Sequence, residues 1–182
     1  MHTKNPPSIT YVKAKVYYKL YLAILLLFCQ GTTAVAADLA QYKKMAENTI
    51  EQAASGHISD IDALIVQQEM MIKIGINACN EYASKNPSAK RTMDLVTSNV
   101  ESMKKLSLHE IEEKWHEGGE FKKNGITIDD HFSELGSLID AVIHPATSYI
   151  ALNHFKKNKN KNHLQQVVAE LTEVLAHIAQ VK

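Results

Sequence analysis

The sequence predicts an all-α protein, an antiparallel helical bundle of four long helices with a short extra helix. From residue 38 onward, hydrophobic side chains recur at spacings of three and four residues, which is typical of helices with one buried face. Helix-capping and helix-stopping residues divide this pattern into segments with brief connections. No stretch shows the alternation of polar and apolar residues that is typical of a strand, and there is no internal repeat.

Residues 1–36 have the three parts of a cleavable secretory signal peptide. A basic start is followed by a short apolar core, Leu20–Phe28, and by an A-x-A cleavage site, Ala34–Ala36. The core is shorter than the roughly 20 residues that a membrane span needs. A retained membrane anchor and a lipoprotein linked at Cys29 are the alternatives, but a large residue precedes this cysteine where a lipobox has a small one. We therefore expect residues 37–182 to form one exported domain, periplasmic or secreted, with no membrane attachment.

Removal of the signal peptide leaves a mildly acidic chain. Residues 1–36 contain four lysines and no acidic residue, so residues 37–182 keep 16 basic and 20 acidic residues, a net charge of −4. This charge argues against nucleic acid as a partner. Cleavage also leaves Cys79 as the single cysteine, which excludes an internal disulfide framework. An ordinary hydrophobic core must therefore stabilise the domain, and a chain of this length can form one.

Two helices are predicted over residues 38–54 and 59–84. Ser59 and Asp62 resemble a capping box at the start of the second helix, and an Asn-Pro pair ends it. Apolar residues cover more than one face of this second helix, which is typical of a central position in the core. Gly75 within it should cost about 1 kcal/mol relative to alanine, and close packing against another helix would explain its presence.

A third helix, over residues 88–106, leads into the short extra helix. Ser107 and Glu110 form a capping box, which predicts that the short helix begins at Leu108. The Gly-Gly pair at Gly118 predicts where it ends.

A further long helix and a last helix complete the predicted bundle. Thr127 and Asp130 are predicted to cap the long helix, whose apolar stripe continues past Pro145. An interior proline costs about 3 kcal/mol or more, so we expect one bent helix with its kink near His144. A polar loop rich in lysine and asparagine then leads to the last helix, over residues 163–179.

No strong catalytic motif is present. The chain has no C-x-x-C-H for covalent haem and no C-x-x-C metal knuckle. It also lacks G-x-S-x-G, H-E-x-x-H and a glycine-rich phosphate loop. Cys79 is expected on the apolar face of a helix, where a thiol keeps its proton and is unreactive. The sequence therefore favours a role other than catalysis.

Histidine is the unusual residue, since eight of the nine remain after residue 36. At about 100° per residue, His109, Glu112 and His116 fall within roughly 60° of one another on the short helix. Imidazole and carboxylate on one face can chelate a divalent transition metal such as copper or zinc. His131 is four residues before Leu135, on the predicted core stripe, and is the candidate fourth ligand. The same residues are also consistent with a solvated helix face and a hydrogen-bonded core histidine.

Asp140 and His144 are predicted to form an exposed pair, and His177 is predicted to lie off the apolar stripe of its helix. Asp140 and His144 lie opposite the apolar stripe of their helix, and His177 lies away from the stripe of the last helix, beside Glu170 and Glu173. A Glu-x-x-His element that is typical of di-iron bundles occurs once, whereas those sites need two copies.

The mature N-terminus, ADLAQYKKMAENTIEQA, resembles the first helix of small periplasmic four-helix-bundle b-type cytochromes. In that family, a methionine early in the first helix and a histidine close to the C-terminus bind haem. The resemblance lies at the two ends of the mature chain. It implies haem b as a cofactor, with Met45 and His177 as its ligands.

Two classes of function follow from these patterns. In the first, an exported helical bundle binds a transition metal or haem through histidines, as a carrier, sensor or electron-transfer module. In the second, the bundle binds a protein partner or a small ligand and holds no metal.

Overall fold

The computed structural model describes residues 38–128 and 130–181, so the predicted signal peptide, with Cys29 and Ala34–Ala36, lies outside the described residues. All regular structure in the described residues is helical, and they contain no strand. The predicted all-α class is therefore confirmed. The described residues form more helices than the four long ones and one short one that the sequence predicts.

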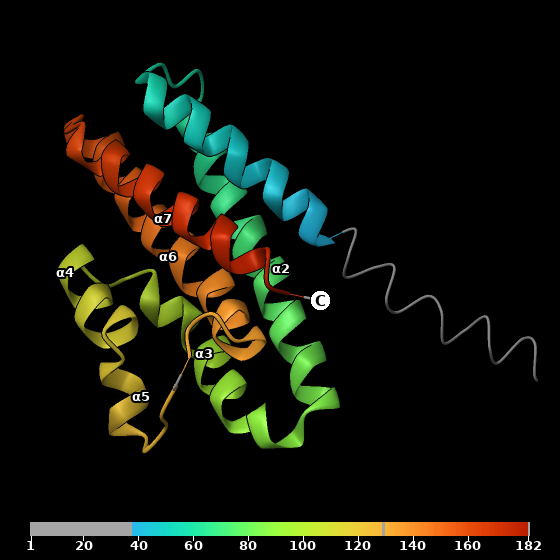
Figure 1. Cartoon of the computed structure of the whole chain (residues 1–182). Coiled ribbons are helices and arrows are strands. Elements are labelled where there is room, and N and C mark those ends of the chain that lie inside the picture. Colours follow the sequence, from blue (N-terminus) through green and yellow to red (C-terminus); the bar gives the residue numbers. More distant parts are fainter. Residues whose placement is uncertain (1–37, 129, 182) are drawn as a thin grey trace, which may run out of the picture. The chain divides into compact units, whose positions relative to one another are not determined.

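Short connections join the helices, except for residues 124–133 between α5 and α6 (Figure 1). Their bounds are residues 38–55 for the first helix, then α2 Ile61–Lys85, the 3₁₀ turn η1 Pro87–Ala89, α3 Lys90–Met103, α4 Leu108–Ile111, the π-helical turn η2 Glu112–His116, α5 Gly119–Lys123, α6 Glu134–Asn158 and α7 Asn162–Ile178.

Helix α6 is the central element, because it packs along both α2 and α7 (Figure 1). Sixteen of its 25 residues are buried. It is long and apolar enough to cross a membrane by length and composition, but most of it is covered by the rest of the protein. Its burial on several sides explains why polar residues in its middle, such as Asp140 and His144, do not face solvent.

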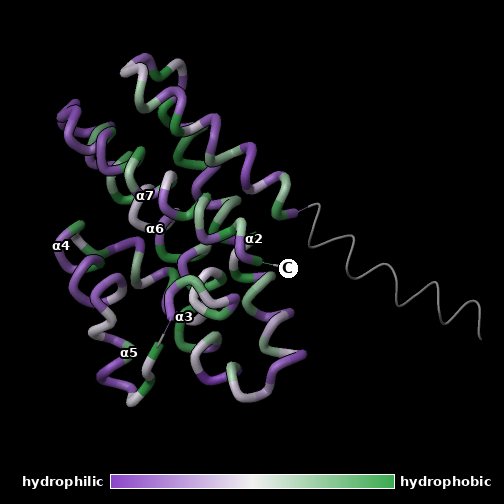
Figure 2. Tube along the Cα trace, in the orientation of Figure 1, coloured by the Kyte–Doolittle hydropathy of each residue, from purple (hydrophilic) through white to green (hydrophobic). Residues whose placement is uncertain are grey.

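Two apolar clusters form the core. One joins α2, α3, α4 and α5 to α6 and includes Trp115 and Phe121, whose rings meet edge to face with centroids 5.6 Å apart. The other joins the first helix, α2, α6 and α7. Hydrophobic and hydrophilic residues are interleaved along the helices (Figure 2), as expected for helices that bury only part of their surface.

Gly75 lies where α2 comes close to the backbone of α6. A Cβ atom at this position would lie 2.6 Å from the carbonyl oxygen of Ala141 and 2.9 Å from the side chain of Val142. The close packing that the sequence suggests for Gly75 is therefore present, and only glycine fits here without a shift of one helix.

The helix caps agree with the sequence at one of three predicted sites. Ser107 forms the predicted capping box with Glu110 at the start of α4. Asp60, rather than Ser59, caps α2 by accepting hydrogen bonds from two backbone amides of its first turn. Helix α6 begins after Ser133 rather than at Thr127, because the Ser133 hydroxyl accepts the Gly136 amide at 3.1 Å.

Helix α6 continues through Pro145, as the unbroken apolar stripe predicts. Cys79 is buried and free, as predicted. Its Sγ donates to the carbonyl of Leu138 at 3.3 Å, and burial raises the pKa of the thiol to about 12.

Candidate metal centre

Two polar stripes face each other between α6 and α7. Asp140 and His144 are one turn apart on α6, and Glu170 and His177 are two turns apart on α7. These four side chains are buried, with exposed fractions of 7%, 3%, 5% and 3% respectively. Buried charged groups are uncommon unless they are paired or bind a metal. The stripe between these helices is therefore a candidate functional site.

His144 and Glu170 are in direct contact. Nδ1 of His144 lies 2.7 Å from Oε2 of Glu170, and the Gln166 amide donates to the other carboxylate oxygen of Glu170. His116 approaches the same carboxylate from η2, with its Nε2 3.6 Å from Oε2. One ligand atom from each of His116, His144 and Glu170 falls within 4.8 Å of the other two. Two imidazoles and one carboxylate are thus close enough to share a metal ion.

Asp140, His144 and His177 form a second triad. Their ligand atoms also lie within 4.8 Å of one another. Oδ2 of Asp140 lies 3.4 Å from Nδ1 of His177, but that nitrogen has no hydrogen-bond partner despite its burial. The rings of His144 and His177 stack at a centroid distance of 5.9 Å. The two triads share His144.

A π-helical turn positions His116. The amide of Glu117 bonds to the carbonyl of Glu112 at 2.9 Å, a spacing of five residues instead of four. Because such a turn rotates less per residue than an α-helix, His116 does not keep the phase that a regular helix would give it relative to His109. Nε2 of His116 lies 2.9 Å from the Thr147 hydroxyl, which itself donates to the carbonyl of Ile143. Thr147 therefore accepts the His116 N–H, and a metal ion at this nitrogen would replace that proton.

The turn before α6 brings His131 and Phe132 to the site. A Cβ on Gly136 would lie 2.5 Å from the carbonyl oxygen of His131, so glycine allows this turn to fold back onto the first turn of α6. The ring of Phe132 stacks on His177 with centroids 4.6 Å apart and an interplanar angle of 20°. Phe132 therefore covers one side of the second triad while staying exposed itself.

The two triads line a pocket of about 450 Å³. The side chains of Asp140, His144, Glu170 and His177 are buried at its base. Four lining residues are exposed to solvent, namely Glu112, His131, Phe132 and Glu173. The full lining is Glu112, His116, His131, Phe132, Asp140, His144, Gln166, Ala169, Glu170, Glu173 and His177. Two acidic residues at an open pocket attract cations from solvent.

Burial disfavours the charged form of each ionisable side chain at the base of the pocket. It lowers the pKa of His144 to about 4 and also lowers the pKa values of His116 and His177. Burial raises the pKa of Asp140 to about 7, and the negative charges of Glu173 and Glu170 contribute to the increase. The pKa of Glu170 is raised as well, mainly by burial. In the described part of the chain, histidines are the only ion-pair partners of the two buried carboxylates.

The four metal ligands predicted from the short helix and its neighbour are placed differently by the structure. His116 belongs to the first triad. Glu112 and His131 line the pocket but are exposed, so the prediction that His131 lies on the core stripe is wrong: this residue precedes α6. His109 is exposed and is not among the lining residues, because the π-helical turn separates it from His116.

The two predicted haem ligands lie in different surroundings. His177 lines the polar pocket, and the prediction that it faces away from the core is wrong, since it is buried. Met45 belongs to the apolar cluster of the first helix, α2, α6 and α7, and is not among the residues that line the pocket.

Asp140, His144, Glu170 and His177 are the site residues that the sequence did not identify. The prediction that Asp140 and His144 form an exposed pair is wrong, because α7 covers that face of α6. The sequence carries one usable signal. Polar residues recur along one face of α7 at helical spacing, namely Gln166, Glu170, Glu173 and His177. This face resembles a solvated one unless the partner stripe on α6 is known.

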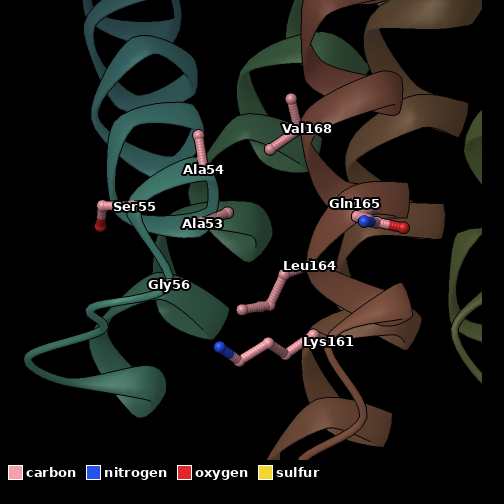
Figure 3. A pocket seen from close by; sticks show the side chains of 8 residues that line it. All are labelled: Ala53, Ala54, Ser55, Gly56, Lys161, Leu164, Gln165 and Val168. Atoms are coloured by element: carbon pink, nitrogen blue, oxygen red, sulfur yellow. The ribbon is translucent and has the colours of Figure 1, made fainter.

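A second pocket, of about 330 Å³, lies between the end of the first helix and the start of α7. Figure 3 shows Lys161 and Leu164 extending from α7 toward the first helix. Its polar lining residues Ser55, Lys161 and Gln165 are exposed, and its lining contains no histidine or carboxylate. It has no set of metal ligands and is the weaker candidate.

Comparison of the chain with protein-family models, with curated proteins and with solved structures finds no match. What is established is a helical protein with buried histidine–carboxylate clusters that have the composition and spacing to hold a metal.

Proposed function

We propose that this protein binds a divalent transition metal ion through His116, His144 and Glu170. The observation that carries the proposal is that these three side chains, from η2, α6 and α7, bring one ligand atom each within 4.8 Å of the others at the base of a pocket. Two of the three are buried, so a metal ion there would be held by the protein rather than by surface groups.

The charges of the site support the same conclusion. Asp140 and Glu170 are buried, and burial lowers the pKa of the His144 ring beside them, so the ring is neutral near pH 7. A neutral imidazole can bind a metal ion. Because it carries no positive charge, it does not balance the negative charge of the buried carboxylates. A divalent cation supplies the positive charge. Buried carboxylates without a cation are costly unless they are protonated, which agrees with the raised pKa of Asp140.

The ligand types narrow the choice of metal. Imidazole suits zinc, copper, iron and nickel, whereas calcium and magnesium prefer oxygen ligands. Two histidines and one carboxylate with open positions also resemble the ligand set of non-haem iron(II) sites. In this proposal an antiparallel bundle of long helices is the scaffold, and the exported protein acts as a carrier, sensor or electron-transfer module.

Calorimetric titration with zinc, copper(II) and, under anaerobic conditions, iron(II) tests the proposal. Wild-type protein should bind at least one of these ions. His116→Ala should weaken binding by at least about tenfold, because even changes to groups behind the ligands cost 10–100-fold in metal affinity. His109→Ala is the matched control, since it removes a histidine from the same segment that is exposed and does not line the pocket.

Equal affinity in wild type and His116→Ala would contradict the assignment of His116 as a ligand. An absence of binding for all three ions would contradict the proposal as a whole. That second outcome would favour the alternative of an exported bundle that binds a protein partner or a small ligand without a metal.

A further inference from the structure

We infer that the same pocket binds a second metal ion, held by Asp140 and His177 and sharing His144 with the first. This inference rests on the proposed function, because it extends the first site to a pair of ions. The two triads have the same composition, two histidines and one carboxylate, and in each triad the ligand atoms lie within 4.8 Å of one another.

The state of His177 is an independent observation that points to a ligand. Its Nδ1 is buried and has no hydrogen-bond partner. Oδ2 of Asp140 lies 3.4 Å from this nitrogen but does not form a hydrogen bond with it. Buried polar atoms are nearly always paired, so an exception needs an explanation. An ion between this nitrogen and the carboxylate would satisfy both atoms at once.

The surroundings of His177 fit a ligand as well. The Phe132 ring stacks on it, and His144 stacks with it at 5.9 Å, so the orientation of the His177 ring is fixed by its neighbours. Glu173 lies at the rim, with Oε1 3.9 Å from Nε2 of His177. A fixed ring beside a buried carboxylate and an exposed acid is an arrangement that can receive a cation from solvent.

His144 can serve both ions because an imidazole ring has two nitrogens. When both nitrogens bind metal, the ring gives up its N–H proton, which leaves to solvent. The shared ring would then bridge the two ions.

Zinc stoichiometry measured by native mass spectrometry tests the inference. Wild-type protein should bind two zinc ions. Asp140→Asn and His177→Gln, tested separately, should each bind one, and His144→Ala should lose both high-affinity sites. Far-UV circular dichroism in the presence of EDTA establishes that each variant is folded. Using two single variants on different helices keeps the test valid if one of them does not fold.

Copper(II) gives a second readout in the wild type. Two copper ions bridged by one ring should couple magnetically, so the electron paramagnetic resonance signal per copper should fall as the second equivalent binds. Asp140→Asn should keep the full signal of one isolated ion.

The outcomes separate this inference from the proposed function. One zinc ion in the wild type that Asp140→Asn retains would overturn the second site and leave the first intact, whereas no bound zinc would overturn both. Two ions in the wild type and in both Asp140→Asn and His177→Gln would place the second ion elsewhere and contradict the assignment. His163→Ala controls for surface binding, because His154 and His163 form another pair, with ring centroids 5.3 Å apart; this variant should keep two ions.

Discussion

The hydroxyl of Tyr42 donates a hydrogen bond of 3.0 Å to the carbonyl oxygen of Ala141. In a regular helix that oxygen would accept the amide of the residue four positions later, but this residue is Pro145, which has no N–H. Burial also raises the pKa of Tyr42 well above its usual value, which keeps the hydroxyl protonated as a donor. A side chain of the first helix thus replaces the missing backbone hydrogen bond, one turn from the candidate metal ligand His144.

Tyr42→Phe should therefore lower the free energy of unfolding by about 1–3 kcal/mol, since it leaves a buried carbonyl without a partner. The measurement is urea denaturation followed by circular dichroism. Tyr149→Phe is the control, because the Tyr149 hydroxyl makes no hydrogen bond to any other residue described by the structure; this change should have less than half the effect. Equal losses in the two variants would mean that the Ala141 hydrogen bond contributes nothing specific.

Gly75→Ala should destabilise the protein by about 1–3 kcal/mol, the usual cost of overpacking a core. In an isolated helix the same change would be favourable by about 1 kcal/mol, so the sign of the effect tests the packing. The added Cβ would lie 2.6 Å from the Ala141 oxygen, and α2 and α6 would have to separate. Lys73→Ala, at an exposed position of the same helix, is the control for denaturation experiments. A stabilised Gly75→Ala protein would contradict the close approach of the two helices.

Among the buried groups of the pocket, His144 and Asp140 should make opposing contributions to the pH dependence of stability in the metal-free protein. The folded pKa of His144, about 4, is below its unfolded value of about 6.5, so its contribution is complete above pH 6.5 and is lost as the pH falls toward 4. The folded pKa of Asp140, about 7, is above its unfolded value of about 3.9, so its contribution is lost as the pH rises from about 4 to 7. With rising pH between about 4 and 6.5, His144 therefore increases the free energy of unfolding and Asp140 decreases it.

Asp140→Asn removes the loss of stability that Asp140 causes as the pH rises. The variant should gain stability with rising pH between about 4 and 6.5, and at pH 8 it should exceed the wild type by on the order of 4 kcal/mol. Urea denaturation in EDTA at several pH values measures this. Asp94→Asn, at an exposed position, should follow the wild-type curve. An Asp140→Asn protein that is less stable than wild type at pH 8 would show that this carboxylate is not destabilised by its burial.

Cys79 should react slowly with thiol reagents. It is 0% exposed, and burial raises its pKa to about 12, so the reactive thiolate is scarce at neutral pH. We expect labelling by a disulfide reagent to require unfolding and to become complete in concentrated guanidinium chloride. Rapid labelling of the native protein, or a disulfide-linked dimer, would contradict the burial of this residue.

We predict that the protein is exported and that its mature form begins near Ala37. The basic start, the short apolar core and the Ala34–Ala36 site predict cleavage there, which would remove Cys29 and leave a chain with a net charge of −4. Intact-mass measurement of protein recovered from the export compartment checks this prediction. A retained N-terminus or a lipid-modified Cys29 would disprove it.

The sequence by itself determined the features that depend on neighbouring residues. Hydrophobic spacing predicts the helices, and the Ser107–Glu110 capping box predicts the start of α4, because a cap involves groups only three residues apart. The burial of Cys79 followed from its position on an apolar stripe. The local pattern of the short helix predicts His116 as a candidate ligand, although the same pattern also includes the exposed His109.

Only the tertiary structure decided which polar residues form the site. Asp140 and His144 on α6 have the same spacing whether their face is solvated or covered, and Glu170 and His177 on α7 are equally ambiguous. Burial of these faces depends on the packing of α6 against α7, which joins residues 26 positions apart in the case of His144 and Glu170. The helical spacing of residues in the sequence predicts which side chains share a face. It does not predict what lies opposite that face, and here the opposite face is a second stripe of histidine and carboxylate side chains that could hold a metal.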